Sequence, residues 1–230
     1  MTLPDFSFEK KLWNKGFKVV AGMDEVGRGC FAGAIVAGCV VFDRNTITTF
    51  KDTVLKGNRK IIINDSKQLT PRQRKVADKW IRQNALAIGI GQASVAQINR
   101  FGIKKASEIA FRKAIKSVSI KVSSIEYLLI DAFFIPYVRS LRRKNQKAII
   151  KGDTKSISIA AASIVAKVYR DKLMVKISKN PKFRVYKWGK NKGYGTKEHQ
   201  NAIKKYGATK LHRKAFVATW LNKLKVKSEK

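Results

Sequence analysis

Residues 17–42 have the sequence FKVVAGMDEVGRGCFAGAIVAGCVVF. Two apolar runs, 17–23 and 34–42, flank a turn that contains Gly27 and Gly29. Each run has the length and the β-branched content of a strand. The few residues between them leave no room for a crossover helix, so the stretch predicts an antiparallel pair of strands.

A polar segment, 43–69, comes after these two strands. We expect it to be loop apart from a candidate strand at 61–63. Thr70-Pro71-Arg72-Gln73 is typical of a helix start, with Thr as the N-cap, Pro at the first helical position and Gln returning the capping bond. We expect that helix to end near residue 83. The remaining pattern predicts strands at 86–93, 127–130 (as a buried central strand) and 147–151, helices at 94–99, 104–117, 156–178, 197–206 and 212–223, and a frayed tail at 225–230. This order predicts an α/β fold, a mixed sheet covered by helices.

Composition narrows the class of protein. The chain has 230 residues, of which 44% are hydrophobic, so it can form a core and is not a disordered basic tail. Cys30 and Cys39 are too few for a disulfide scaffold, which favours a reducing cytosol. No apolar run reaches the ~18 residues of a membrane span, and residues 1–15 lack a signal-peptide core. We therefore expect a cytoplasmic protein that does not insert into membranes.

The charge balance points to a polyanionic partner. Lys and Arg number 50 against 15 Asp and Glu, which gives a formal charge of +35 at pH 7. Basic side chains near phosphates release counterions, so nucleic acid is the expected partner. Part of the excess is also consistent with a solvated surface, because 36 of the 50 basic residues are lysines. Charge alone does not separate a binding protein from an enzyme.

Four of the few acids stand where expected strands end. Asp24 and Glu25 follow the first strand, Asp131 follows the strand at 127–130, and Asp153 follows the strand at 147–151. Carboxylates that meet at one sheet edge repel one another unless a divalent cation holds them, and a set of oxygen ligands favours Mg²⁺ or Mn²⁺. The alternative is that each acid caps a loop or pairs with a nearby Lys or Arg. The presence of four acids together favours the metal site.

The turn after the first strand also fits a second hypothesis. Residues 27–32, Gly-Arg-Gly-Cys-Phe-Ala, match the dinucleotide-binding pattern G-x-G-x-x-G/A. That pattern needs a helix directly after the glycines, whereas 34–42 has the character of a strand. The glycines are better explained as a tight loop whose backbone approaches a sugar-phosphate.

An ordered series of motifs resembles the ribonuclease HII family, the type 2 ribonucleases H. The series comprises Asp24-Glu25-Val26-Gly27-Arg28-Gly29, Asn64-Asp65-Ser66-Lys67-Gln68-Leu69, Leu129-Ile130-Asp131, Lys151-Gly152-Asp153, the small-residue run at 159–171, Lys192-Gly193-Tyr194-Gly195-Thr196 and His212-Arg213. The resemblance covers about residues 17–217. It implies an RNase H-like mixed five-stranded sheet flanked by helices, with a catalytic domain over 1–180 and a C-terminal helical, substrate-binding extension with a basic tail over 181–230.

The resemblance also implies an activity. A member of this family would be a ribonuclease H that cleaves RNA in RNA/DNA hybrids, and cleaves duplex DNA on the 5′ side of an embedded ribonucleotide. The products would carry 3′-hydroxyl and 5′-phosphate ends, in keeping with a role in replication and ribonucleotide excision repair. Two Mg²⁺ or Mn²⁺ ions would be held by Asp24, Glu25, Asp131 and Asp153 in a two-metal hydrolysis. We expect a monomer, and the sequence does not identify a DNA sliding-clamp partner.

The family's substrate contacts map onto three segments. Gly27, Arg28 and Gly29 match the loop that reads the ribose 2′-hydroxyl, the group that distinguishes a ribonucleotide from DNA. Tyr194 matches the aromatic residue that stacks on the neighbouring deoxyribose. Ser66 and Lys67 match expected phosphate contacts.

Some features depart from the family or separate its branches. Cys30 and Ala34 stand where proline is common, and Ala132 stands where glycine is common. Arg28, in place of the lysine typical of ribonuclease HIII, and the 23 residues before Asp24 favour HII over HIII. A catalytically silent nucleic-acid-binding protein is a further alternative, disfavoured because four carboxylates would weaken binding to a phosphate chain.

Overall fold

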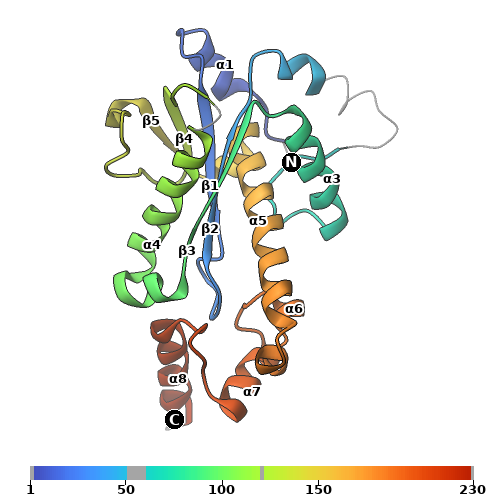
Figure 1. Cartoon of the computed structure of the whole chain (residues 1–230), viewed down its shortest axis with the longest axis vertical. Helices are drawn as coiled ribbons and strands as arrows, with labels where there is room; N and C mark the ends of the chain where they lie inside the picture. The colour runs from blue at the N-terminus through green and yellow to red at the C-terminus, as the bar shows by residue number, and fades with distance from the viewer. Residues whose placement is uncertain (1–2, 51–60, 120–121, 229–230) are drawn as a thin grey trace. The chain divides into compact units, whose positions relative to one another are not determined.

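A mixed five-stranded sheet forms the centre of the computed structural model, which describes residues 3–50, 61–119 and 122–228 (Figure 1). The strands are β1 Val20–Val26, β2 Ile35–Val41, β3 Ala87–Ala93, β4 Tyr127–Asp131 and β5 Gln146–Ile149, in the order β3-β2-β1-β4-β5. Strand β1 is antiparallel to β2 and parallel to β4, and β4 is parallel to β5. The predicted α/β fold with a mixed sheet is confirmed. The central position belongs to β1, and β4 is its neighbour.

Helices account for most of the remaining described chain. They are α1 Ser7–Trp13, α3 Pro71–Asn84, α4 Val95–Val118, α5 Ile157–Ser178, α6 Trp188–Asn191, α7 Lys197–Tyr206 and α8 Lys214–Ser228, with 3₁₀ turns η1 Arg143–Asn145, η2 Gly152–Thr154 and η3 Pro181–Tyr186. The predicted capping box begins α3, since the Gln73 N–H donates to Thr70 Oγ1 and the Thr70 N–H donates to Gln73 Oε1. Helix α4 is interrupted at Gly102, whose φ is 77°, as the gap between the two predicted helices required.

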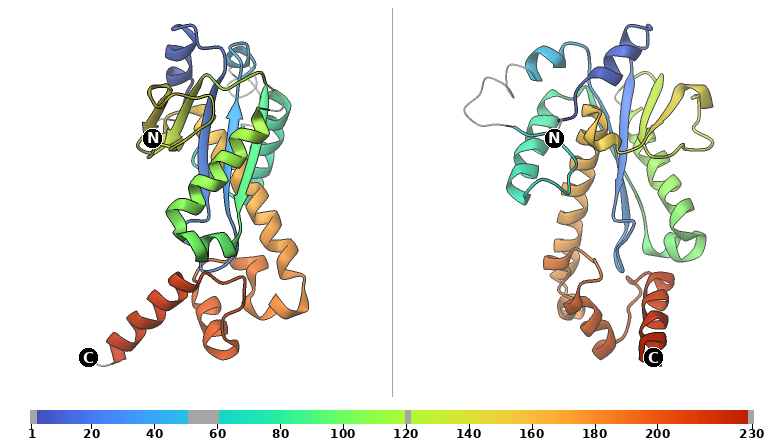
Figure 2. Two further views of the ribbon diagram at one scale, coloured as in Figure 1. Left: turned by 60° about the vertical axis from the view of Figure 1, so that its left-hand side comes forward. Right: turned by 180° about the vertical axis from the view of Figure 1, so that it is seen from behind.

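Glycines in the strands allow helices to pack closely against both faces of the sheet. Helix α5 covers one face and α4 the other (Figures 1 and 2). A Cβ at Gly38 of β2 would lie 2.3 Å from the carbonyl oxygen of Ala162 in α5. On the other face, a Cβ at Gly91 of β3 would lie 2.1 Å from the carbonyl oxygen of Ala110 in α4. The small-residue part of α5 therefore serves to bring the helix against the sheet.

Three expectations about local structure are wrong. Residues 61–63 form no strand, and Ile63 instead places a buried side chain in the core beneath α3 and α5. The segment 43–69 is not all loop, because residues 46–50 are helical, and 51–60 lie outside the described residues. Helix α8 continues to Ser228, past the start of the expected frayed tail, of which 229–230 lie outside the described residues.

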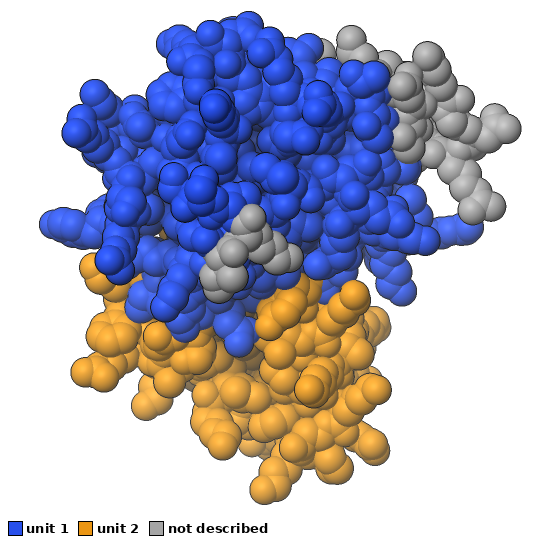
Figure 3. All heavy atoms as spheres, turned by 45° about the horizontal axis from the view of Figure 1, so that its top comes forward, with its two compact units in different colours: residues 1–26, 36–92, 108–168 blue, residues 27–35, 93–107, 169–230 orange. Residues whose placement is uncertain are grey.

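The chain divides into two compact units, coloured in Figure 3. The first comprises 1–26, 36–92 and 108–168 and holds nearly all of the sheet with its hydrophobic core. The second comprises 27–35, 93–107 and 169–230, and its own core is built around Met174, Tyr186 and Trp188. Residues 181–230, the expected extension, fall in the second unit together with the loop 27–35.

Cys30 and Cys39 are both fully buried, and neither forms a disulfide. Burial raises the pKa of the Cys39 thiol far above its ordinary value. Within the part of the chain that the structure describes, no helix is both long enough and apolar enough to span a membrane.

Candidate active site

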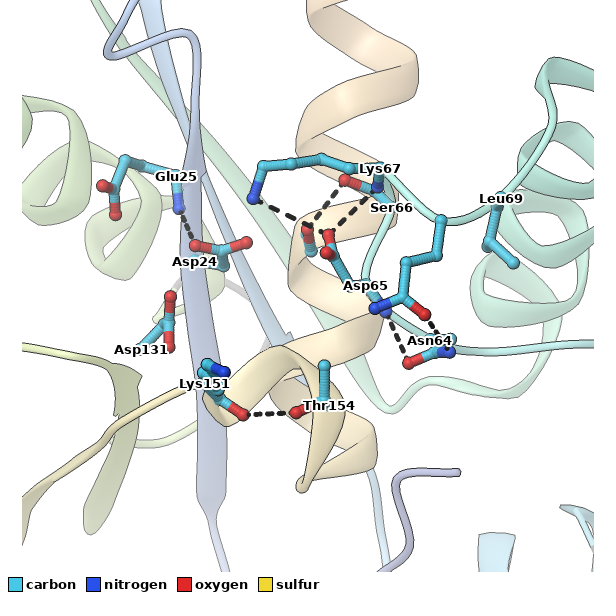
Figure 4. Close-up of polar contacts among 12 residues, drawn as sticks. Asp24, Glu25, Asn64, Asp65, Ser66, Lys67, Leu69, Asp131, Lys151 and Thr154 are labelled. Atoms are coloured by element: carbon cyan, nitrogen blue, oxygen red, sulfur yellow. Dashed lines mark hydrogen bonds and ion pairs between the residues drawn. The ribbon is translucent and has the colours of Figure 1, made fainter. Parts of the chain in front are cut away.

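Strand register brings the candidate carboxylates to one edge of the sheet. Met23 of β1 is paired with Ile130 of β4, so Asp24 and Asp131 occupy the next position on adjacent parallel strands. Asp131 is paired in turn with Ile149 of β5, and η2 with Asp153 follows that strand. Figure 4 shows Asp24, Glu25 and Asp131 grouped on β1 and β4. Asp24 and Glu25 lie inside β1, rather than after it as expected, because the antiparallel pairing with β2 continues to Val26.

Asp24 is buried among like charges. The residue is 5% exposed, and its Oδ1 accepts the N–H of Glu25 at 2.7 Å. Burial raises the pKa of Asp24 well above its ordinary value, and the charges of Glu25, Asp131 and Asp153 raise it further, while a hydrogen bond with Ser163 acts in the opposite direction. The fold thus holds a carboxylate where its charge is unfavourable unless a cation compensates it.

Asp153 shares its surroundings with a fifth acid that the sequence interpretation did not single out, Asp65. Burial, with the charges of Asp65 and Asp131, raises the pKa of Asp153 to about 6, and Lys67 partly opposes this. The Lys67 Nζ lies 3.7 Å from Asp65 Oδ1. Asp65 stands inside the motif at 64–69, and its nearness to Asp153 comes from tertiary packing, which the sequence does not reveal.

Lys67 presents its ammonium group to this acidic region. Its side chain is 72% exposed. Burial lowers the pKa of Lys67, but the carboxylates, Asp65 and Asp24 foremost, raise it by more, so the net shift is upward. A cavity of about 660 Å³ opens here, and its lining includes Asp65, Lys67, Asp131 and Asp153.

Ser66 has a different environment from its neighbour. It is only 1% exposed, and its hydroxyl is 2.9 Å from the hydroxyl of Ser163 on α5. The carbonyl of Ser66 accepts the Arg74 guanidinium at 2.7 Å. Ser66 therefore attaches the 64–69 segment to α5 and α3, while the side chain of Lys67 is exposed beside the acids.

The residue that follows Asp131 has an unusual backbone conformation. Ala132 has a φ of 62°, in the left-handed region that favours glycine. The expectation of glycine at this position in the family has a physical reason here. The Oδ1 of Asp131 accepts the N–H of Gly152 at 2.8 Å, which ties the end of β4 to η2.

The candidate substrate-reading residues lie in the second unit. Gly27 has a φ of 97°, and Arg28 and Gly29 are exposed at the tip of the turn. Tyr194 is 37% exposed, and its ring centre is 5.9 Å from the guanidinium carbon of Arg170. Cys30, one of the departures from the family, is fully buried directly after the turn.

The donor set fits a hard divalent cation in chemistry. It consists of carboxylate oxygens only, and the burial of Asp24 among three other acids gives it a charge that a cation would balance. The side chains are not arranged around one point: over residues 3–50, 61–119 and 122–228 no three Asp, Glu, His or Cys side chains form a metal-binding group. Asp131 and Asp24 instead accept backbone N–H groups.

Comparison with known proteins shows the family to which this chain is similar. The family model described as Ribonuclease HII matches residues 21–220. A ribonuclease HII from Wolbachia pipientis subsp. Culex pipiens (strain wPip) is 44% identical over 217 residues, which is 94% of this chain and 97% of that protein.

Two solved structures share the fold. Bst-RNase HIII in complex with Mn²⁺ aligns with a TM-score of 0.67 at 20% identity, covering 89% of this chain and 70% of the other. The PCNA:RNase HII complex from Archaeoglobus fulgidus has a chain that aligns with a TM-score of 0.62 at 20% identity, covering 85% of this chain and 93% of the other. Because the family model matches residues 21–220 and the Wolbachia relative is 44% identical over 94% of this chain, the chain belongs to the ribonuclease HII family.

Proposed function

We propose that the protein is a metal-dependent endonuclease that cleaves RNA in RNA/DNA hybrids and duplex DNA on the 5′ side of an embedded ribonucleotide. The observation that carries the proposal is the placement of Asp24 and Asp131 at matching positions on adjacent parallel strands, with Asp153 in the turn η2 that follows β5, in a chain of the ribonuclease HII family. A role in ribonucleotide excision repair follows from this substrate. We propose the wild-type protein acts as a monomer.

Asp24, Glu25, Asp131 and Asp153 would hold two Mg²⁺ or Mn²⁺ ions. When bound, such ions activate water and neutralise charge on the scissile phosphate. Rotation of Asp131 away from the Gly152 N–H would free its oxygen for this purpose. The Mn²⁺ complex of Bst-RNase HIII, a relative in fold, supports a divalent cation.

The protein's own side chains would bind and orient the nucleic acid. Lys67, exposed beside the acidic cavity, would bind a phosphate of the cleaved strand and offset the charge of the carboxylates. Arg28 and Gly29 would contact the ribose 2′-hydroxyl, and Tyr194 would stack on the adjacent deoxyribose. We propose that segment 181–230 contributes to duplex binding. The PCNA-bound structure of a relative supports a sliding clamp as a candidate protein partner.

The test is a labelled DNA duplex with one ribonucleotide, incubated with Mg²⁺, with Mn²⁺ or with EDTA. We expect a metal-dependent nick on the 5′ side of the ribonucleotide, with 3′-hydroxyl and 5′-phosphate ends. Tyr194→Ala should impair cleavage of this substrate more than cleavage of a long hybrid. Binding without any nick would favour a silent binding protein, and cleavage of long RNA runs alone would favour HIII-like specificity.

Asp24→Asn gives the sharpest check of the assigned carboxylates. The substitution removes a metal ligand and leaves the basic surface intact, so cleavage should be abolished while the Kd for duplex stays within a few-fold. Gel-resolved cleavage and fluorescence anisotropy measure the two effects. Asp5→Asn, an exposed acid-to-amide change before α1 whose amide oxygen can still accept the Ser7 N–H, is the matched control and should cleave normally. Wild-type turnover by Asp24→Asn would contradict the site assignment.

A further inference from the structure

Two arginines of the second unit are fully buried, Arg170 on α5 and Arg213 before α8. Burial lowers the pKa of Arg213 to about 10, which leaves it charged at neutral pH. Among the described residues, no ion pair joins a carboxylate to either side chain. Burying a charge without a counter-charge is costly. The positions of the two arginines therefore call for an explanation other than packing.

Both guanidinium groups donate to backbone carbonyls, and most of these belong to the loop 28–34. The Arg213 guanidinium donates to the carbonyl of Arg28 at 2.8 Å and twice to the carbonyl of Gly33, at 3.0 and 2.9 Å. The Arg170 guanidinium donates to the carbonyls of Ala32 at 3.1 Å, Ala34 at 3.0 Å and Lys192 at 2.9 Å. Hydrogen bonds to charged groups are stronger than those between neutral groups. The two side chains thus fix the inner side of the loop at four residues.

Glycines make room for this arrangement. Gly27 has a φ of 97°, and a Cβ there would lie 2.3 Å from Nε of Arg170. Gly193 has a φ of 83°, and a Cβ there would lie 2.4 Å from the carbonyl oxygen of Ala32. Gly29 differs, because a Cβ there would meet no atom within 4 Å. The two glycines of the turn are therefore required for different reasons. Gly27 makes room for the Arg170 side chain, and Gly29 keeps the tip of the turn free of a side chain.

The arrangement leaves the backbone N–H and carbonyl of one residue of the loop, Gly29, available. The N–H groups of Phe31 and Ala32 donate to Gly193 O, and that of Gly33 donates to Leu211 O. In contrast, no hydrogen bond within the described residues uses the peptide N–H or carbonyl of Gly29, which is exposed. The fixed loop thus presents its tip to solvent.

We propose that Arg170 and Arg213 are positioning residues that hold the loop 28–34 so that its tip, with Tyr194, can discriminate a ribonucleotide from a deoxyribonucleotide. The inference rests on the proposed function of Gly27, Arg28, Gly29 and Tyr194. Arg170 positions both the loop and the segment that carries Tyr194. Its guanidinium donates to carbonyls of the loop and to the carbonyl of Lys192, two residues before Tyr194. A lysine has one ammonium group and cannot reach carbonyls that diverge around a planar fork.

The test compares Arg213→Lys and Arg170→Lys with the wild type. Fluorescence anisotropy gives the Kd for a duplex with one ribonucleotide and for the same duplex in DNA alone, and cleavage with Mn²⁺ gives kcat and KM. We expect the ratio of the two Kd values to fall about tenfold or more, with all-DNA binding within twofold of wild type. On a long hybrid, kcat should change less than on the single-ribonucleotide substrate.

Ile203→Ala is the matched control, since Ile203 is a buried core residue of the same unit on α7. It should lower the melting temperature without changing the Kd ratio. Gly27→Ala gives a second variant, because the new Cβ would displace Arg170, and it should mimic Arg170→Lys. The proposal is overturned if the arginine variants keep the wild-type ratio, or if Ile203→Ala loses the ratio equally.

Hydrogen exchange separates this inference from the proposed function. Amides of 31–33 should exchange faster in Arg213→Lys than in wild type, with no nucleic acid present. A wild-type protein that neither cleaves nor discriminates would refute the proposed function, and unchanged exchange in the variants would refute the positioning role.

Discussion

Asp24, one of the proposed metal ligands, occupies a position that is unfavourable for the stability of the protein. Its carboxylate is buried beside three acids, an arrangement that disfavours its ionised form and that no packing argument requires. Functional sites commonly hold such groups. In EDTA, where no cation compensates the charge, Asp24→Asn should therefore unfold at a higher temperature than the wild type, although it loses cleavage.

Ala132 has a second locally unfavourable feature, its backbone conformation. Its φ of 62° disfavours any residue with a Cβ. We expect Ala132→Gly to stabilise the protein by about 0.5–1 kcal/mol, because it relieves this conformation. Urea unfolding measures the change. Ala148→Gly is the control, because Ala148 lies in β5 with an ordinary strand backbone, and this substitution should destabilise the protein. Stabilisation by both substitutions, or by neither, would contradict the explanation.

Among single residues, the sequence can nominate as candidates those whose position in the chain is itself informative. Asp24, Asp131 and Asp153 are such candidates, because acids are rare in this chain and each of the three follows an apolar run or a short expected strand. Arg170 and Arg213 could not be found in this way, because they are two of 50 basic residues and their burial depends on tertiary contacts. Asp65 was hidden because its nearness to Asp153 depends on how the 64–69 segment packs on α5.

Among the elements, α5 packs so closely on the sheet that β2 has no room for an added side chain at Gly38. A Cβ at Gly38 would lie 2.3 Å from the Ala162 carbonyl, so β2 and α5 would have to separate. Gly38→Ala should destabilise the protein by about 1–3 kcal/mol, the usual cost of overpacking. The urea midpoint reports the loss. Gly29→Ala is the control, because its Cβ would meet open space, and it should unfold within ~0.5 kcal/mol of wild type.

The second unit has a polar pair in its core. His212 Nδ1 accepts the Thr209 N–H at 2.8 Å, His199 Nδ1 is 2.8 Å from the Tyr194 carbonyl, and the two Nε2 atoms are 3.1 Å apart. Burial, with the neighbouring His199, lowers the pKa of His212 to about 4. Burial also lowers the pKa of His199, so the surroundings of both imidazoles favour their neutral forms.

This pair should make the protein sensitive to acid. Between pH 6.5 and about 4 the unfolded chain binds a proton that folded His212 does not, so stability falls as pH falls. Asp153, whose pKa is raised, acts in the opposite direction over part of that range. The stability difference between wild type and His212→Gln isolates the histidine, and should shrink by about 2 kcal/mol from pH 7.5 to pH 5. A difference that stays constant with pH would argue against a neutral, buried His212.

Element prediction succeeded where local chemistry decides the structure. The capping box of α3 and the break at Gly102 depend on neighbouring residues, and both were predictable. The apolar run 61–63 has the composition of a strand, yet Ile63 packs into the core without pairing, and composition cannot distinguish the two. The extension of β1 through Asp24 and Glu25 also depends on a partner strand, because acids do not favour strands on their own.

Over the whole molecule, the charge of +35 should govern affinity for nucleic acid. Counterion release predicts a slope steeper than about −4 in log K against log salt, equivalent to about five neutralised phosphates. Titrations of an all-DNA duplex at several salt concentrations give this slope. The same duplex with one ribonucleotide should have a matching slope, since the 2′-hydroxyl adds no charge. A flat response would mean that the excess charge does not contact the duplex.

The two buried cysteines have a practical consequence for watching this protein at work. Both thiols of the chain are shielded from solvent, and that of Cys39 resists ionisation, so maleimide dyes should react with neither at a useful rate in the folded state. A cysteine introduced at an exposed position can then be labelled selectively without first removing native thiols. The protein is thus suited to single-molecule fluorescence on immobilised duplexes.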